Sequence, residues 1–264
     1  MLIHIHIPKN AGTTVDSILK RNFGERYYDF YTDRNGKFLT QSEFIQLVKK
    51  IQPYTDVLSA HDIHPLEQET SKQLELNYFT LIRHPVERAR SLYYHERRNT
   101  GKNHISQKSF HEYVQERSKE DRAISNWQTY NIGGEADFFK AKKILDNFAL
   151  VGLVEKFDES LLLLREKFKK GLNKNKLINL NIFYQQQNIS QSKIVTEPMG
   201  EEKTLEKLIE MNQEDLQLFE YASTRLNIEI SKINNFQIQK NIFQTTNLLY
   251  NRVNQIRWSL KSLN

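Results

Sequence analysis

The sequence predicts an α/β fold of three layers, in which helices cover both faces of a mainly parallel sheet. Short apolar runs of β type alternate with segments whose apolar residues recur at helical spacing. A small-residue turn joins the first run to the first helical segment, which gives a P-loop-like strand–loop–helix unit. With 264 residues and 38% hydrophobic content, the chain can bury one substantial core.

The elements follow one another along the chain. Residues 2–7 form the first predicted strand, and Val15, Ile18 and Phe23 mark one face of the helix after it. Further strands are predicted at 56–60, 78–83 and 149–153, and helices at 42–51, 67–76, 86–98, 155–168 and 201–226. Residues 169–200 are predicted to be irregular, with one strand at 177–184. The predicted fold therefore ends in C-terminal helices.

Residues 1–229 are predicted to form one domain, followed at 230–264 by a basic amphipathic helical tail that packs on the same domain. The tail has no acids and carries five bases, namely Lys232, Lys240, Arg252, Arg257 and Lys261. Its apolar residues recur at helical spacing, namely Ile242, Leu249, Val253, Ile256, Leu260 and Leu263. Contact of the tail with an anionic membrane surface, or with a polyanionic acceptor, remains an alternative.

The composition excludes several classes of protein. The chain has no cysteine, so it has no disulfide, thiolate metal site or cysteine nucleophile. No apolar run reaches the length of about 18 residues that a membrane-spanning helix needs. The N-terminal segment lacks the pattern of a secretory signal. The chain has 38 Lys and Arg and 32 Asp and Glu, and five of these bases lie in the tail. Residues 1–229 therefore carry a net charge close to zero, and we expect no nucleic-acid-binding surface on them.

The turn after the first strand has the composition of an anion-binding loop. It comprises Lys9, Asn10, Ala11, Gly12, Thr13 and Thr14. Backbone N–H groups at a helix N-terminus attract anions, and Gly12 allows a close approach of the backbone. The loop is not a Walker A motif, because the residue after the glycine is not lysine. A plain strand–helix turn remains an alternative.

A second anion site is predicted after the strand at 78–83. Arg83 ends that strand, and Ser91 lies about two turns into the helix that starts at His84-Pro85. A guanidinium offers a planar fork that suits phosphate, and a hydroxyl adds a donor. A nucleotide with two separated phosphates would bridge the two sites. Taken alone, a solvated arginine and a surface serine would explain the same residues.

Together these motifs resemble the sulfotransferases that use 3′-phosphoadenosine 5′-phosphosulfate (PAPS). The resemblance rests on a Pro-Lys-x-Ala-Gly-Thr-Thr loop after the first strand, and on an Arg followed by a Ser eight residues later. Segments 125–129, 151–168 and 215–222 resemble parts of the carbohydrate-directed branch, which includes the heparan-sulfate 2-O-sulfotransferases. The resemblance implies that PAPS is the co-substrate. It also implies that residues 9–14 bind the 5′-phosphosulfate, and that Arg83 and Ser91 bind the 3′-phosphate.

His61 is the predicted general base. Transfer of a sulfuryl group to a hydroxyl requires removal of a proton, and an imidazole suits this role near neutral pH. His61 follows a predicted strand and, as in the resembled branch, stands after a small residue, here Ala60. The uronyl 2-O-sulfotransferases have a second histidine where this chain has Ser59. Asp62 or His64 could orient His61 or be the base instead.

Three residues lie in the segment that resembles the adenosine site. Trp127 is a candidate to stack on adenine, because an aromatic face suits a purine, and core packing is the alternative. Gln128 and Thr129 could reach the base or the ribose.

The histidines at the start of the chain favour packing over metal binding. His4 and His6 share one face of the first strand. With His61 and His64 they match no metal-site spacing known to us, so we expect packing beside the loop. The predicted reaction requires no metal.

We therefore expect a sulfotransferase that moves a sulfuryl group from PAPS to a hydroxyl, on a carbohydrate acceptor, by in-line displacement. Lys9 would stabilise the leaving phosphate and His61 would take the proton. The product would be adenosine 3′,5′-bisphosphate. An ATP-dependent P-loop kinase and a non-catalytic polyanion-binding module are the alternatives. Many eukaryotic relatives are membrane-anchored, and this chain shows no anchor, so we expect a cytoplasmic, bacterial protein of undetermined oligomeric state.

Overall fold

The computed structural model describes residues 1–31, 37–99, 108–118, 122–169, 180–185 and 202–261. At its centre lies a sheet of five strands in the order β2-β3-β1-β4-β5, and all pairings within these residues are parallel. The strands are β1 (Leu2–Ile5), β2 (Tyr27–Phe30), β3 (Val57–Ala60), β4 (Asn77–Ile82) and β5 (Leu150–Leu153). The predicted α/β fold with a parallel sheet is confirmed.

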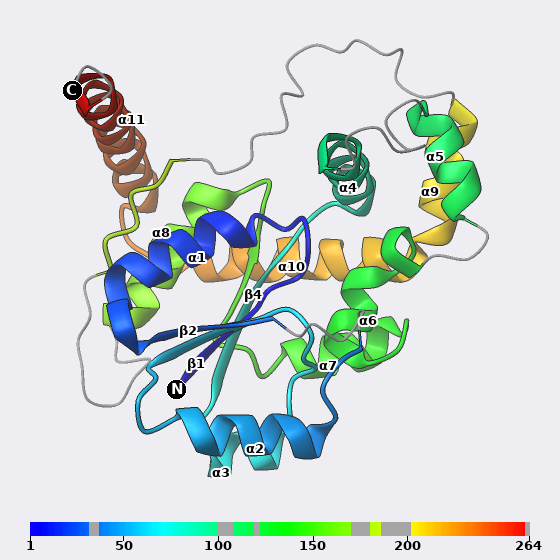
Figure 1. Ribbon diagram of the computed structural model, residues 1–264, viewed down its shortest axis with the longest axis horizontal. Coiled ribbons are helices and arrows are strands. Elements are labelled where there is room, and N and C mark those ends of the chain that lie inside the picture. Colours follow the sequence, from blue (N-terminus) through cyan, green and yellow to red (C-terminus); the bar gives the residue numbers. More distant parts are fainter. Residues whose placement is uncertain (32–36, 100–107, 119–121, 170–179, 186–201, 262–264) are drawn as a thin grey trace.

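Helices cover both faces of the sheet (Figure 1). The helices α1 (Gly12–Phe23) and α8 (Phe157–Lys169) lie on one face, and α2 (Gln41–Ile51) and α3 (Gln68–Gln73) lie on the other. The connections from β1 to β2 and from β3 to β4 run in opposite directions across the sheet. Right-handed crossovers therefore place their helices on opposite faces. With helices on both sides, β1, β3 and β5 are buried at every position.

The register of the sheet brings three strand ends together. Ile5 at the end of β1 pairs with Ala60 of β3 and with Thr80 of β4. The strand order reverses at β1, and ligands of open α/β sheets bind at such a point, beyond the carboxyl ends of the strands. The residues that follow β1, β3 and β4 are therefore the first place to look for a site.

Among the described residues, the connection from β4 to β5 holds four α-helices, of which the sequence predicted only the first. They are α4 (Pro85–Asn99), α5 (Phe110–Arg117), α6 (Trp127–Gly133) and α7 (Phe138–Leu145). Helices α5 to α7 have seven or eight residues each, which is too short for a clear apolar periodicity. The pattern also misses β2, a half-exposed four-residue strand at the edge of the sheet.

The strand predicted at 177–184 is wrong where the structure describes it, because residues 180–185 form no strand. Side chains of α1 satisfy the backbone there instead. The carbonyl of Asn181 accepts hydrogen bonds from Arg21 Nη2 at 2.9 Å and from Asn22 Nδ2 at 3.0 Å. Residues 177–179 lie outside the described residues.

The helical region predicted at 201–226 consists of two helices, α9 (Glu202–Met211) and α10 (Gln213–Ser231). They meet at Asn212, which is buried. Its Nδ2 donates to the carbonyl of Ile124 at 2.8 Å and to that of Leu208 at 2.9 Å. A side chain committed to two carbonyls explains why the chain turns at this residue.

The amphipathic tail forms one long helix, α11 (Phe236–Lys261), which packs along α8 over part of its length. Phe243 is buried, and Lys240 pairs with Glu159 of α8 at 2.7 Å. The opposite face is exposed, with Ile242 at 61% and Leu249 at 55%. Within the described residues, no helix has the length and apolar character needed to cross a bilayer.

Candidate active site

Three predicted site segments meet at the carboxyl edge of the sheet. The loop of residues 8–11 follows β1, His61 follows β3, and Arg83 follows β4. Since β1 lies between β3 and β4, the loop lies between the other two. The guanidinium of Arg83 donates from Nη1 to the carbonyl of Lys9 at 3.0 Å, which joins the two predicted phosphate-binding segments directly.

The loop has an unusual backbone. Lys9 has a φ of 71° and Ala11 a φ of 61°, in the left-handed region that residues other than glycine rarely adopt. Ala11 is the N-cap of α1, and no side chain caps this helix. Strained residues cluster at ligand-binding sites, and uncapped N–H groups at a helix N-terminus attract anions. The conformation therefore suits a phosphate or sulfate group.

Gly12 has a structural role that the sequence did not reveal. A Cβ at this position would lie 1.9 Å from Nε2 of His6, and it would also meet two carbons of the same ring. Only glycine leaves room for this imidazole. The sequence assigned Gly12 to phosphate approach, and the structure adds that the residue is needed for contact between α1 and β1.

Asn10 and Gln128 form a buried link beneath the loop. Asn10 Nδ2 donates to the carbonyl of Leu81 and to Gln128 Oε1, both at 2.7 Å. Gln128 Oε1 also accepts from the backbone N–H of Arg83 at 2.9 Å, and its Nε2 donates to the carbonyl of Arg83 at 2.8 Å. The two side chains thus hold the loop after β1 against Arg83, which follows β4.

A carboxylate from α10 anchors this link. Asp215 is fully buried and accepts from the backbone N–H groups of Gln128 at 3.1 Å and Thr129 at 2.7 Å. The Thr129 hydroxyl donates to the same carboxylate at 2.7 Å. Asp215 therefore caps α6 from another helix. Sequence reasoning did not single it out, although it lies in a segment that carried the family resemblance.

Lys9 and Arg83 make a concentrated positive site. Neither side chain pairs with a carboxylate within ion-pair distance among the described residues. Burial lowers the pKa of Lys9 to about 8, with Arg98 and Arg83 contributing. Burial also lowers the pKa of Arg83. Two half-buried cations side by side are unfavourable until an anion binds between them.

Helix α4 supplies further groups. Ser91, His95 and Arg98 are spaced by four and three residues and so share a face. Burial lowers the pKa of His95, and the positive charges of Lys9 and Arg98 lower it further, so the three groups lie within electrostatic range of one another. Only Ser91 was predicted from the sequence. The spacing from Ser91 was the signal that could have found the other two.

His61 contacts the rings of His6 and Tyr31. The two imidazole rings lie 3.7 Å apart between centroids, and Tyr31 meets His61 edge-on at 5.6 Å. Burial, with the neighbouring His6, lowers the pKa of His61 to about 3, so the imidazole is neutral at physiological pH. His64, the alternative base, donates from Nδ1 to the carbonyl of Asn131 at 2.9 Å.

Trp127 belongs to an aromatic group. Its ring stacks on Tyr130 at 5.6 Å, and Phe38 meets it edge-on at 6.2 Å. His64 stacks on Phe38 at 4.1 Å. Trp127 is half-buried, so part of its surface remains accessible. The predicted stacking on adenine remains a prediction.

A surface cavity of about 780 Å³ lies elsewhere. Its lining runs from His64 and Gly134 to Tyr78 and Phe148, along α3 and α7. It includes neither Lys9, His61 nor Arg83. The cavity is therefore separate from the strand ends at which the predicted donor-binding residues meet.

Comparison with known proteins supplies the remaining observation. Residues 1–222 match the profile described as the Sulfotransferase family, which spans every predicted site residue. The chain belongs to the sulfotransferase family. Membership implies a sulfuryl-transferring enzyme that uses PAPS as donor.

Two known proteins are similar to this sulfotransferase. An uncharacterized protein of Archaeoglobus fulgidus is 27% identical over 244 residues, covering 83% of this chain and 94% of the relative. The crystal structure of a sulfotransferase from Alicyclobacillus acidocaldarius matches with a TM-score of 0.42 and 15% identity, over 83% of this chain and 98% of that one. The family assignment rests on the profile match.

Proposed function

We propose that this sulfotransferase transfers the sulfuryl group of PAPS to a hydroxyl of a carbohydrate acceptor. The observation that carries the proposal is the meeting of Lys9 and Arg83 at the strand-order reversal, joined by a hydrogen bond and without carboxylate partners among the described residues. Two half-buried cations beside an uncapped helix N-terminus suit a ligand with several anionic groups. PAPS carries its charge on two separated ends, as such a site requires.

Each end of the donor has its own set of residues in this proposal. The 5′-phosphosulfate lies at the N-terminus of α1, against the backbone of residues 9–14, with Lys9 near the oxygen that bridges sulfur and phosphorus. The 3′-phosphate lies at Arg83 and Ser91. Arg98, on the same face of α4 as Ser91, adds positive charge near Lys9, and His95 adds a neutral imidazole. Electrostatic preorganisation of this kind stabilises charge that develops on a leaving phosphate.

His61 is the proposed base. The acceptor hydroxyl approaches sulfur in line with the departing phosphate oxygen, and His61 takes its proton as the new S–O bond forms. His61 is neutral in the free protein, and the neutral imidazole is the form that accepts a proton. The negative charge passes to the 5′-phosphate, next to Lys9.

Asn10, Gln128 and Thr129 act by positioning in this proposal. Their side chains are buried and bonded within the protein, so they hold the loop and Arg83 in place. Trp127 is the proposed stacking partner of the adenine. The carbohydrate acceptor comes from the resemblance to the carbohydrate-directed branch, and a cytoplasmic location from the expectations stated above.

The test is a calorimetric titration with adenosine 3′,5′-bisphosphate and, separately, with ATP. We expect tight binding of the bisphosphate, much weaker binding of ATP, and loss of binding in Arg83→Ala. The matched control is Arg26→Ala, because Arg26 lies at the other edge of the sheet, where it pairs with Asp56 at 2.7 Å. Preference for ATP would indicate a kinase. Absence of binding to either nucleotide would indicate a polyanion-binding module, and either result would overturn the proposal.

A further inference from the structure

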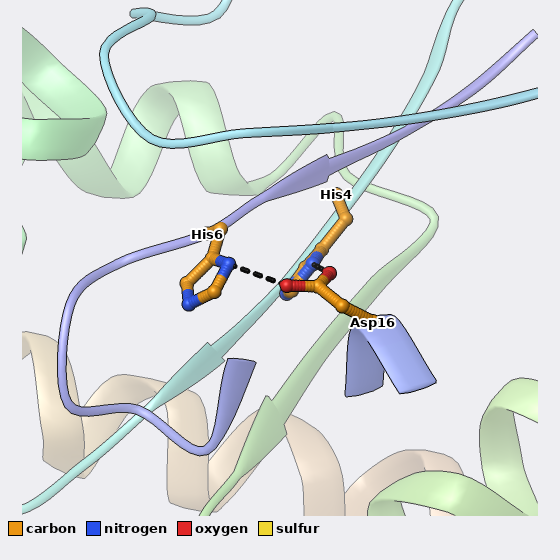
Figure 2. A group of neighbouring side chains, drawn as sticks. All are labelled: His4, His6 and Asp16. Atoms are coloured by element: carbon orange, nitrogen blue, oxygen red, sulfur yellow. Dashed lines mark hydrogen bonds and ion pairs between the residues drawn. The ribbon is translucent and has the colours of Figure 1, made fainter. Parts of the chain in front are cut away.

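Three polar side chains cluster between β1 and α1, behind the loop of residues 8–11, which we call the donor loop (Figure 2). His4 lies in β1 and His6 directly follows it, so the two face the same side, where Asp16 of α1 points back at both. Asp16 Oδ1 lies 3.2 Å from His4 Nδ1, and Oδ2 lies 2.8 Å from His6 Nδ1. All three groups offer a ligand atom, and these atoms lie within 4.8 Å of one another.

Asp16 is the acid of this cluster. Its side chain is partly buried, at 16% exposed, and its two oxygens face imidazole nitrogens of His4 and His6. Across the described ranges, no lysine or arginine lies within ion-pair distance of Asp16. A buried carboxylate needs a cation close by, either a proton on an imidazole or a metal ion.

His6 provides an independent observation. Its side chain is more than nine-tenths buried, and Nδ1 has no aligned hydrogen bond although it faces Asp16 at 2.8 Å. A buried nitrogen rarely lacks a partner. An imidazole nitrogen that faces a carboxylate without a hydrogen bond can instead present its lone pair to a metal.

We propose that His4, His6 and Asp16 bind a divalent transition-metal ion, with Zn²⁺ as the best fit. Two neutral imidazoles and a carboxylate are a donor set that zinc and similar ions use. Ser59 supports this set, because its hydroxyl donates to Asp16 Oδ1 at 2.6 Å and lies 2.9 Å from His4 Nδ1. Such outer hydrogen bonds orient metal ligands in proteins.

A metal at this place would join β1 to α1 just behind the donor loop. Nε2 of His6 fills the space beside Gly12, and the ring contacts that of His61 in a tilted arrangement. The ion would therefore brace both the helix N-terminus and the proposed base. It would also stabilise the folded chain, since the three ligands lie together only in the fold.

The experiment uses the full chain, freed of any histidine tag and treated with a chelator. It is titrated with Zn²⁺ by calorimetry and with Co²⁺ by visible absorption. We expect a single bound equivalent, the visible bands of a low-coordinate Co²⁺ site, and a higher Tm with Zn²⁺. Asp16→Asn and His4→Gln should each weaken binding by about 100-fold or more. The matched control is His64→Gln, a half-buried histidine outside the cluster, which should bind as the unaltered protein does.

The Co²⁺ spectrum of the unaltered chain decides the question even if a variant fails to fold. Absence of the visible bands, or binding that Asp16→Asn leaves intact in a folded variant, would overturn the proposal. The cluster would then be an imidazole–carboxylate network balanced by a proton. The proposal does not rest on the donor site, because metal binding is measured without PAPS or an acceptor.

Discussion

Lys9 is half-buried, and burial disfavours the positive charge of its ammonium group. Nucleotide binding should therefore depend on pH. In the free protein the pKa of Lys9 is lowered to about 8, first by burial and then by Arg98 and Arg83. A lysine with a lowered pKa loses its charge as the pH rises through that value. Binding of an anion requires the charged form, so affinity is linked to this proton.

We predict that affinity for adenosine 3′,5′-bisphosphate falls as the pH rises from about 7 to about 10, by about 10- to 100-fold for one lost charged contact. Calorimetry at several pH values measures this fall. Lys9→Arg stays charged throughout and should show a flatter profile, whereas Lys9→Gln should bind weakly at all pH values. An unchanged pH dependence in Lys9→Gln would show that another group is responsible.

Gly12 gives a second prediction for a single residue. In Gly12→Ala the new methyl group overlaps the His6 ring, which is held on both sides. We expect a loss of about 1–3 kcal/mol in the free energy of unfolding, measured with urea, together with weaker nucleotide binding. In the double variant with His6→Ala, the clash and most of its cost should disappear.

Gly133→Ala is the matched control for this substitution. Its Cβ would approach no atom closer than 3.6 Å, and it lies at the end of α6. We expect stability equal to that of the unaltered protein or slightly greater, because alanine loses less entropy in a helix. If both glycine variants behaved alike, the contact between Gly12 and His6 would not explain the first result.

Among the elements, α6 depends on a carboxylate that belongs to α10. Asp215 caps two N–H groups of α6, and α6 presents Gln128 to the loop and to Arg83. A short helix of seven residues has little stability of its own, so this cap decides whether it forms. A helix that is distant along the chain thus controls the geometry of the proposed donor site.

We predict that Asp215→Ala lowers the free energy of unfolding by about 2–3 kcal/mol, because buried donors lose their acceptor. Nucleotide binding should weaken in the variant even at temperatures where it is folded. Circular dichroism and calorimetry measure the two effects. The matched control is Glu220→Ala, an exposed acid on the same helix, for which we expect less than about 0.5 kcal/mol. Equal costs in the two variants would contradict the capping role.

For the molecule as a whole, the question is whether α11 belongs to the same cooperative unit as the sheet. Two neighbouring residues test this, because Phe243 is 3% exposed and Ile242 is 61% exposed. Phe243→Ala should cost about 3–5 kcal/mol and shift the main urea transition, while Ile242→Ala should stay within about 0.5 kcal/mol. A main transition unmoved by Phe243→Ala would mean that α11 unfolds separately from the body.

The sequence by itself determined the fold class and which predicted site residues meet at the carboxyl edge of the sheet. Apolar runs and helical spacing are local signals, and residues at the ends of parallel strands must meet at one edge of the sheet. Lys9, His61 and Arg83 could therefore be selected before any contact was known. The segments missed were those with weak local signals, namely the edge strand β2 and the short helices α5, α6 and α7.

Only the tertiary structure decided what holds these residues in place. Asn10 meets Gln128 across 118 positions, and Thr129 meets Asp215 across 86. His6 fills the space that Gly12 leaves, and Asp16 of α1 faces both His4 and His6. Such contacts join elements that are distant along the chain, and no periodic pattern encodes them. Local periodicity reports which face of an element is buried, whereas the partner on that face is set by how the elements pack.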